Sequence, residues 1–186
     1  EYGGRASSVM DVKMKEGNNK KFGVSGGLGL ISSRLAVEGP IVKDKGSFIV
    51  SGRRSYLDLF LKASKDQDLK NTKLYFYDLN LKANYKITDR DRIFLSGYFG
   101  RDNLSFSDIF GFTWGNATGT LRWNRIINEK LFSNTSVIFS NFNYSFDIGA
   151  DNEKFGVSAS IQDWNVKQDF NYYANRNNSL KFGFNA

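Results

Sequence analysis

Few side chains in this chain could carry out catalysis or bind a metal ion. Cys and His are both absent from its 186 residues, so thiol nucleophiles, thiolate ligands and the usual acid–base group of neutral pH are missing. Two aspartate pairs, Asp66 with Asp68 and Asp89 with Asp91, have the close spacing of calcium ligands. Calcium takes about six to eight oxygen ligands, however, and neither pair is accompanied by enough of them. We therefore expect no metal, no cofactor and no enzymatic activity.

The sequence also argues against a phosphate loop and against nucleic acid as a partner. The glycine-rich stretch 23–29 is not followed by the Lys-Ser or Lys-Thr pair of a phosphate-binding loop. The net charge is +7, but short segments such as 43–45 and 89–92 mix both signs, and no basic stripe is present. A phosphate-rich lipid surface suits such an excess of Lys and Arg equally well. We expect no nucleic-acid partner.

The composition favours β-structure. The chain contains 17 Phe, 9 Tyr, 3 Trp and 18 Gly with a single Pro. No apolar run approaches the roughly 18 residues that a transmembrane helix needs, which excludes a helical membrane protein. A transmembrane β-barrel passes this test, because its strands alternate and so hide their lipid-facing half from any hydropathy average.

The clearest predicted strand covers residues 73–87. Its odd positions from Tyr75 onward are apolar and its even positions from Asp78 onward are polar, as two faces of a strand require. From Tyr75 to Tyr85 it rises roughly 33 Å, or roughly 25 Å along a barrel axis at a tilt of about 40°, which matches a lipid-facing band. A half-buried strand of a soluble sheet alternates in the same way but is usually about 5 to 6 residues long. The expected lipid-facing residues are Tyr75, Tyr77, Leu79, Leu81, Ala83 and Tyr85.

The remaining pattern predicts about nine such strands in an antiparallel up-and-down order. Tight turns are expected at 42–46, 88–91, 128–130 and 171–178, and longer loops at 56–72, 103–113 and 147–154, the first holding a short helix or strand extension near 57–61. The apolar positions change parity between Phe139 and Phe142, which predicts a β-bulge there, and again near Ile161. A propeller with blades of about 40 to 45 residues would give a similar period, although its blades need four short strands.

Several segments resemble TonB-dependent outer-membrane receptors. The run from Tyr2 through Gly3, Gly4, Arg5, Ala6, Ser7 and Ser8 to Val9 resembles the closing strand of their plug domain, as do Asp11 and Val12. Segments 26–30, 38–41 and 46–58 look like the first three barrel strands, and 95–102 and 182–184 fit later ones.

The resemblance implies a plugged bacterial outer-membrane barrel of about 22 strands that imports a scarce nutrient with energy relayed by TonB. The nutrient would be a siderophore, a cobalamin, a glycan or a peptide. Residues 1–19 would be the end of the plug and a linker, and 20–186 the first part of the barrel. The chain would be a fragment, with the TonB-contacting segment outside it. The alternative is a self-contained barrel or propeller that acts as an adhesin or binding module.

Site residues follow from that resemblance and from strand parity. Glu38, Arg53, Asp78 and Lys82 would face the lumen, where charge-assisted hydrogen bonds could hold the plug, or where they could simply be solvated. Arg54 would reach the outer rim and meet lipopolysaccharide phosphate, or be solvated by a loop. The tight turns would be periplasmic and the longer loops external.

Overall fold

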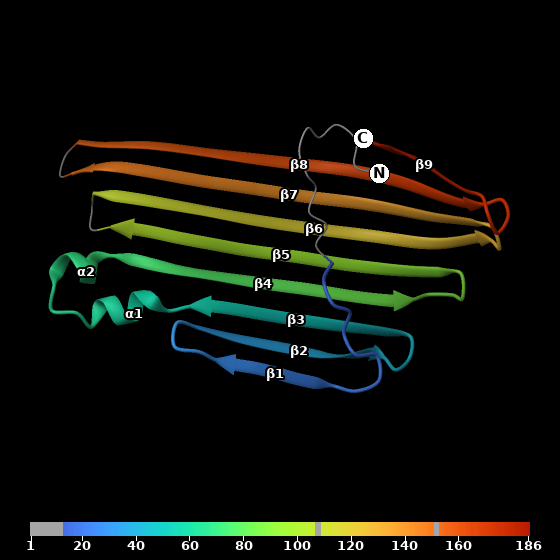
Figure 1. Cartoon of the computed structure of the whole chain (residues 1–186), viewed down its shortest axis with the longest axis horizontal. Helices are drawn as coiled ribbons and strands as arrows, with labels where there is room; N and C mark the ends of the chain where they lie inside the picture. The colour runs from blue at the N-terminus through green and yellow to red at the C-terminus, as the bar shows by residue number, and fades with distance from the viewer. Residues whose placement is uncertain (1–12, 107–108, 151–152) are drawn as a thin grey trace.

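The described residues of this computed structural model, 13–106, 109–150 and 153–186, form one antiparallel sheet with two short helices (Figure 1). Each strand pairs with the next along the chain, in the order β1 to β9. The predicted up-and-down all-β arrangement is therefore confirmed, and a single nine-stranded sheet excludes a propeller. The strands are β1 (Gly23–Leu28), β2 (Ser32–Val42), β3 (Gly46–Ser55), β4 (Lys73–Lys86), β5 (Asp91–Phe106), β6 (Phe110–Asn128), β7 (Leu131–Ala150), β8 (Glu153–Tyr173) and β9 (Ser179–Asn185).

The two ends of the sheet differ. One end, here called the turn end, carries the connections 43–45, 87–90, 129–130 and 174–178, close to the four predicted turns. The opposite end, here called the helix end, carries the helices α1 (Leu57–Lys62) and α2 (Gln67–Asn71) between β3 and β4 (Figure 1). A short helix near 57–61 is thus confirmed. Neither helix of the described chain is long and apolar enough to cross a membrane.

Two predicted loops at the helix end are wrong. Strand pairing continues to Phe106 and resumes at Phe110, and it continues to Ala150 and resumes at Glu153. Polar and apolar residues alternate at 103–106 and at 145–148, and polar side chains on one face of a strand do not interrupt its backbone ladder. The strands consequently lengthen along the chain, from 6 residues in β1 to 21 in β8.

The predicted bulge in β7 is also wrong. The register between β6 and β7 runs without a shift from the pair Phe110–Ile148 to the pair Ile126–Phe132, and β7 and β8 pair without any shift. Phe139 and Phe142 therefore lie on opposite faces of the sheet. The parity change near Ile161 likewise has no bulge behind it.

The chain before β1 crosses one face of the sheet. Residues 13–22 pass over the sheet to reach its turn end (Figure 1). We call residues 13–21 the strap, the face that they cross the strap face, and the other one the open face. The segments 2–9 and 11–12 that resemble a closing plug strand lie outside the described residues, and residues 13–15 do not belong to a strand.

No hydrophobic side chain of the described residues is buried. Large apolar side chains instead stand on the sheet in contact with no second layer, as Leu121 does with 49% of its surface exposed and Trp164 with 66%. A soluble domain of this size would bury its apolar side chains in a core. The sheet is a single layer, and its apolar side chains need a cover from outside the described residues.

Candidate functional site

The two faces of the sheet have opposite character in its turn-end half. On β6 the open face carries Leu121 and Trp123, while the strap face carries Arg122 and Asn124. The same division holds on β4, where all six residues predicted to face lipid lie together on the open face. The geometry is that of a wall with one apolar and one polar surface. Contact of the open face with lipid stays a prediction.

The faces exchange character in the helix-end half of β6, β7 and β8. There the strap face carries an aromatic cluster with ring centroids 4.8 to 6.4 Å apart. We call it the aromatic platform; its members are Phe110, Phe112, Trp114, Phe142, Tyr144 and Phe146. The open face behind it is polar, with Thr113, Asn143, Ser145, Ser158, Ser160 and Gln162. In the sequence, the switch of apolar residues from odd to even positions between Phe139 and Phe142 indicated this exchange of faces. The prediction attributed the switch to a bulge instead.

The apolar band on the open face runs obliquely across the ladder. Leu81 of β4 and Trp164 of β8 lie in one row, connected through the successive strand pairs. Toward the helix end of this row, β4 carries Leu79, Tyr77 and Tyr75, whereas β8 carries Gln162, Ser160 and Ser158. Toward the turn end, β8 and β9 continue the apolar band with Val166, Phe170, Tyr172, Phe182 and Phe184. Strands that cross a flat slab at a tilt produce such an offset.

Two of the four predicted lumen residues hold the strap. The ammonium group of Lys82 lies 2.6 Å from a carboxylate oxygen of Glu16 and donates a 2.8 Å hydrogen bond to the carbonyl of Met14. Glu38 accepts a 3.0 Å hydrogen bond from the backbone N–H of Asn18 and pairs with Lys15 at 3.2 Å. The strap is thereby tied to β2 and β4 at once.

The other strap contacts were not predicted. Asn84, which is buried, donates hydrogen bonds to Glu16 at 2.6 Å and to Ser47 at 2.9 Å. Gly17 passes so close to β3 that a Cβ atom there would collide with the carbonyl oxygen of Phe48. The polar residues at even positions of 78–86 were the available signal for Asn84, but nothing in the sequence identifies their partners.

Arg53 and Asp78 pair with each other on the strap face. The guanidinium lies 2.7 Å from the carboxylate, with a second contact of 2.8 Å through Nε, and it also lies 4.8 Å from the ring centre of Phe76. Arg34 stands directly across the ladder from Arg53. Of the four predicted lumen residues, Glu38 and Lys82 therefore contact the strap, whereas Arg53 and Asp78 contact each other. Contact with a plug domain stays a prediction for all four.

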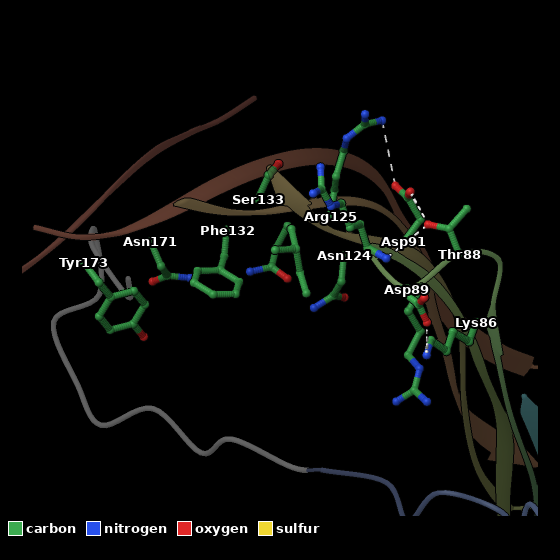
Figure 2. A pocket seen from close by; sticks show the side chains of 14 residues that line it. Lys86, Thr88, Asp89, Asp91, Asn124, Arg125, Phe132, Ser133, Asn171 and Tyr173 are labelled. Atoms are coloured by element: carbon green, nitrogen blue, oxygen red, sulfur yellow. Dashed lines mark hydrogen bonds and ion pairs between the residues drawn. The ribbon is translucent and has the colours of Figure 1, made fainter. Parts of the chain in front are cut away.

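A hollow of about 540 Å³ at the turn end gathers charged side chains (Figure 2). Asp91 is its centre: it accepts hydrogen bonds from the Thr88 hydroxyl at 2.7 Å and from the Trp123 indole at 3.0 Å, with Arg125 3.8 Å away. Asp91 thus ties the turn 87–90 to the neighbouring strand β6.

Both carboxylates that line this hollow, Asp89 and Asp91, are in ion pairs. Lys86 and Asp89 form a 2.6 Å ion pair, and the hydrogen bond and charge of Lys86 hold the pKa of the exposed Asp89 carboxyl below its ordinary value. The described residues contain no group of three or more His, Cys, Asp or Glu that could hold a metal. Of the aspartates first considered for calcium, Asp66 instead accepts a 2.9 Å hydrogen bond from the backbone N–H of Asp68 at the start of α2. The first pair of aspartates thus stabilises the start of α2, and the second pair stabilises the turn 87–90.

Comparison of the chain with known proteins found no matching family model, no matching curated protein and no matching solved structure.

Proposed function

We propose that this chain forms part of the wall of a TonB-dependent outer-membrane transporter that imports a scarce nutrient. The observation that carries the proposal is the exposed, oblique apolar band on the open face. In water, such a band on a single-layer sheet would be a large unfavourable surface. In a bilayer it is covered by lipid tails, and the tilt of barrel strands accounts for its oblique course.

The proposal requires the sheet to close with further strands into a barrel. The strap face then lines the lumen, and the backbone groups at the free edges of β1, of β9 and of the part of β8 that β9 leaves unpaired find partners, as hydrocarbon demands. The strap would bring the end of a plug domain into that lumen, which the contacts of Lys82 and Glu38 support. The turn end would be periplasmic, because outer-membrane barrels have their longer loops outside, and the longest connection between the described strands, 56–72, lies at the helix end.

The exchange of faces fits this orientation. Strands of about 20 residues are twice as long as the about 9 to 11 that cross a bilayer, so β6 to β8 would project beyond it at the helix end. The open face would meet water there, and its side chains are polar. The aromatic platform would line the outer part of the lumen, where an imported molecule enters.

A pair of lysine substitutions tests the proposal. Leu81 lies on the open face in the middle of the band, and Asn80 lies next to it on the strap face. A lysine on the lipid face near mid-bilayer costs about 2 to 4 kcal/mol, whereas a lumen lysine costs little. In the full-length protein, Leu81→Lys should sharply reduce the protease-resistant fraction in the outer membrane, and Asn80→Lys should leave it unchanged.

Equal effects of the two substitutions would contradict the assignment of faces. Partition of the folded wild-type chain into buffer without detergent would contradict membrane insertion itself. It would favour the alternative of a self-contained adhesin or binding module.

A further inference from the structure

A second pocket lies at the helix end, beside the apolar band. It has a volume of about 550 Å³ and is lined by three cationic side chains from three different elements: Arg54 of β3, Lys62 of α1 and Lys73 of β4. Arg54 and Lys73 both lie on the open face, in register with the row of tyrosines on β4. Residues distant in the sequence therefore place three positive charges around one hollow.

The charge of this pocket is not balanced. Its one carboxylate, Asp58, is 5% exposed, and its Oδ1 has no hydrogen-bond partner. Neither Lys62 nor Lys73 forms an ion pair with any described residue, and Arg54 has only the ring of Tyr75, 6.0 Å from its guanidinium carbon. Three cations against one carboxylate leave a surplus of positive charge. Such a surplus on exposed side chains fits an anion with several oxygens, because each lysine and the guanidinium can donate to it.

The surroundings of the pocket favour an anion carried by a lipid. Tyr75 and Tyr77 form its wall, with nearly parallel rings 6.4 Å apart, and Leu79 continues the apolar band directly beyond them. Aromatic rows mark the level of the headgroups in membrane barrels. A phosphate on a headgroup would thus lie among the cations while its acyl chains follow the apolar band.

We propose that Arg54, Lys62 and Lys73 bind the phosphate of an anionic lipid headgroup in the outer leaflet. The site rests on the proposed function, since it needs the open face to meet lipid. It also assigns a role to the connection 56–72: β3 contributes Arg54 and β4 contributes Lys73, and α1 adds Lys62 as the third cation of the site.

Native mass spectrometry of the full-length protein in neutral detergent tests the site. The probe is diphosphoryl lipid A, with its fully dephosphorylated form as the reference lipid. The wild type should retain the phosphorylated lipid at least tenfold more tightly than the reference. The double variant Lys62→Gln with Lys73→Gln should lose about thirtyfold in affinity, the factor expected for two lysines at an anionic membrane surface. Lys65→Gln with Lys70→Gln is the matched control, because both lie in the same connection outside the pocket, and it should bind as the wild type does.

Two further measurements separate the possible failures. Addition of 10 mM inorganic phosphate should displace little of the lipid; complete displacement would assign the site to free phosphate and overturn the proposal. Flotation with phosphatidylcholine vesicles, which carry no net charge, reports insertion independently of the pocket. A protein that floats but binds both lipids equally would refute the phosphate site alone. A protein that fails to float would refute the proposed function and the site together.

Discussion

The ammonium group of Lys82 lies 2.6 Å from a carboxylate oxygen of Glu16, so a residue in the middle of β4 is paired with one that precedes β1. Both charges lie on the strap face, and only 14% of the Lys82 side chain is exposed. The contact fixes the path of the strap across the sheet. It also gives Lys82 a charged partner on the strap face, whereas the neighbouring Leu81 belongs to the apolar band of the open face.

Substitution of Lys82 should loosen the strap. Lys82→Met removes the ion pair with Glu16 and the hydrogen bond to Met14. Because Glu16 is 46% exposed, we expect a loss of only about 1 kcal/mol, which corresponds to roughly fivefold faster hydrogen exchange at the amide of Asn18, the strap N–H that is bonded to Glu38. Lys86→Met is the control, since Lys86 pairs with Asp89 away from the strap. Unchanged exchange in the Lys82 variant would show that other contacts suffice.

A methyl group at Gly17 should be costly. A Cβ atom there would collide with the carbonyl oxygen of Phe48, which belongs to backbone and cannot turn aside. Gly17→Ala should therefore lower the free energy of unfolding in detergent by about 1 to 3 kcal/mol or displace the strap. Gly119→Ala serves as the comparison, because nothing lies within 4 Å of the corresponding Cβ. Similar unfolding midpoints for the two variants would contradict the close approach of strap and sheet.

The carboxyl of Asp89 should titrate below its ordinary pKa of about 3.8, because Lys86 donates to it and attracts its charge. Because folding lowers this pKa, the ion pair stabilises the folded state at pH values above the ordinary pKa of the carboxyl. That contribution is lost as the pH falls through the lowered pKa. Carbon-13 NMR of the side-chain carboxyl should give a low midpoint that rises in Lys86→Gln. The same midpoint in both proteins would remove Lys86 as the cause.

Depth in the membrane can be compared along one ladder row. Leu79 and Gln162 lie in the same row of the open face, connected through Phe99, Ala117 and Asn141. If the slab crosses the strands obliquely, Leu79→Cys should resist a water-soluble thiol reagent in intact membranes and Gln162→Cys should react. These 186 residues hold no native Cys, so each label reports on one position of this part of the wall. Equal reactivity would mean that the band follows the ladder and that the strands are not tilted as proposed.

The regular parts of the fold could be predicted from sequence. Alternation over 73–87 identified both faces of β4, because burial preferences repeat at every second residue of a strand. The four turns could be found as well, since Asp, Asn, Gly and Lys gather where the ladder ends. Strand alternation and turn composition depend only on neighbouring residues, so they can be recognised without knowing which distant residues come into contact.

The parts that failed depend on what surrounds the sheet. Phe139 and Phe142 lie on opposite faces because the apolar face of β7 changes along its length, and a bulge produces the same pattern in the sequence. Likewise, the polar residues in 103–113 and 147–154 predict loops, although strand pairing continues into both segments. The partners of Lys82 and Glu38 in the strap could not be predicted, because they lie far away along the chain.

The exchange of faces also protects the longest strands against mispairing. A slip of one residue between β6 and β7 would turn every side chain of one strand to the wrong side, whether or not the strand changes character along its length. A slip of two residues leaves each side chain on its own face, so a strand of uniform character hardly penalises it. In β7 such a slip would displace the boundary between the two halves, which lies between Phe139 and Phe142, relative to the boundary in β6. The inversion therefore penalises an error that alternation alone would tolerate, and it fixes the alignment of the strands.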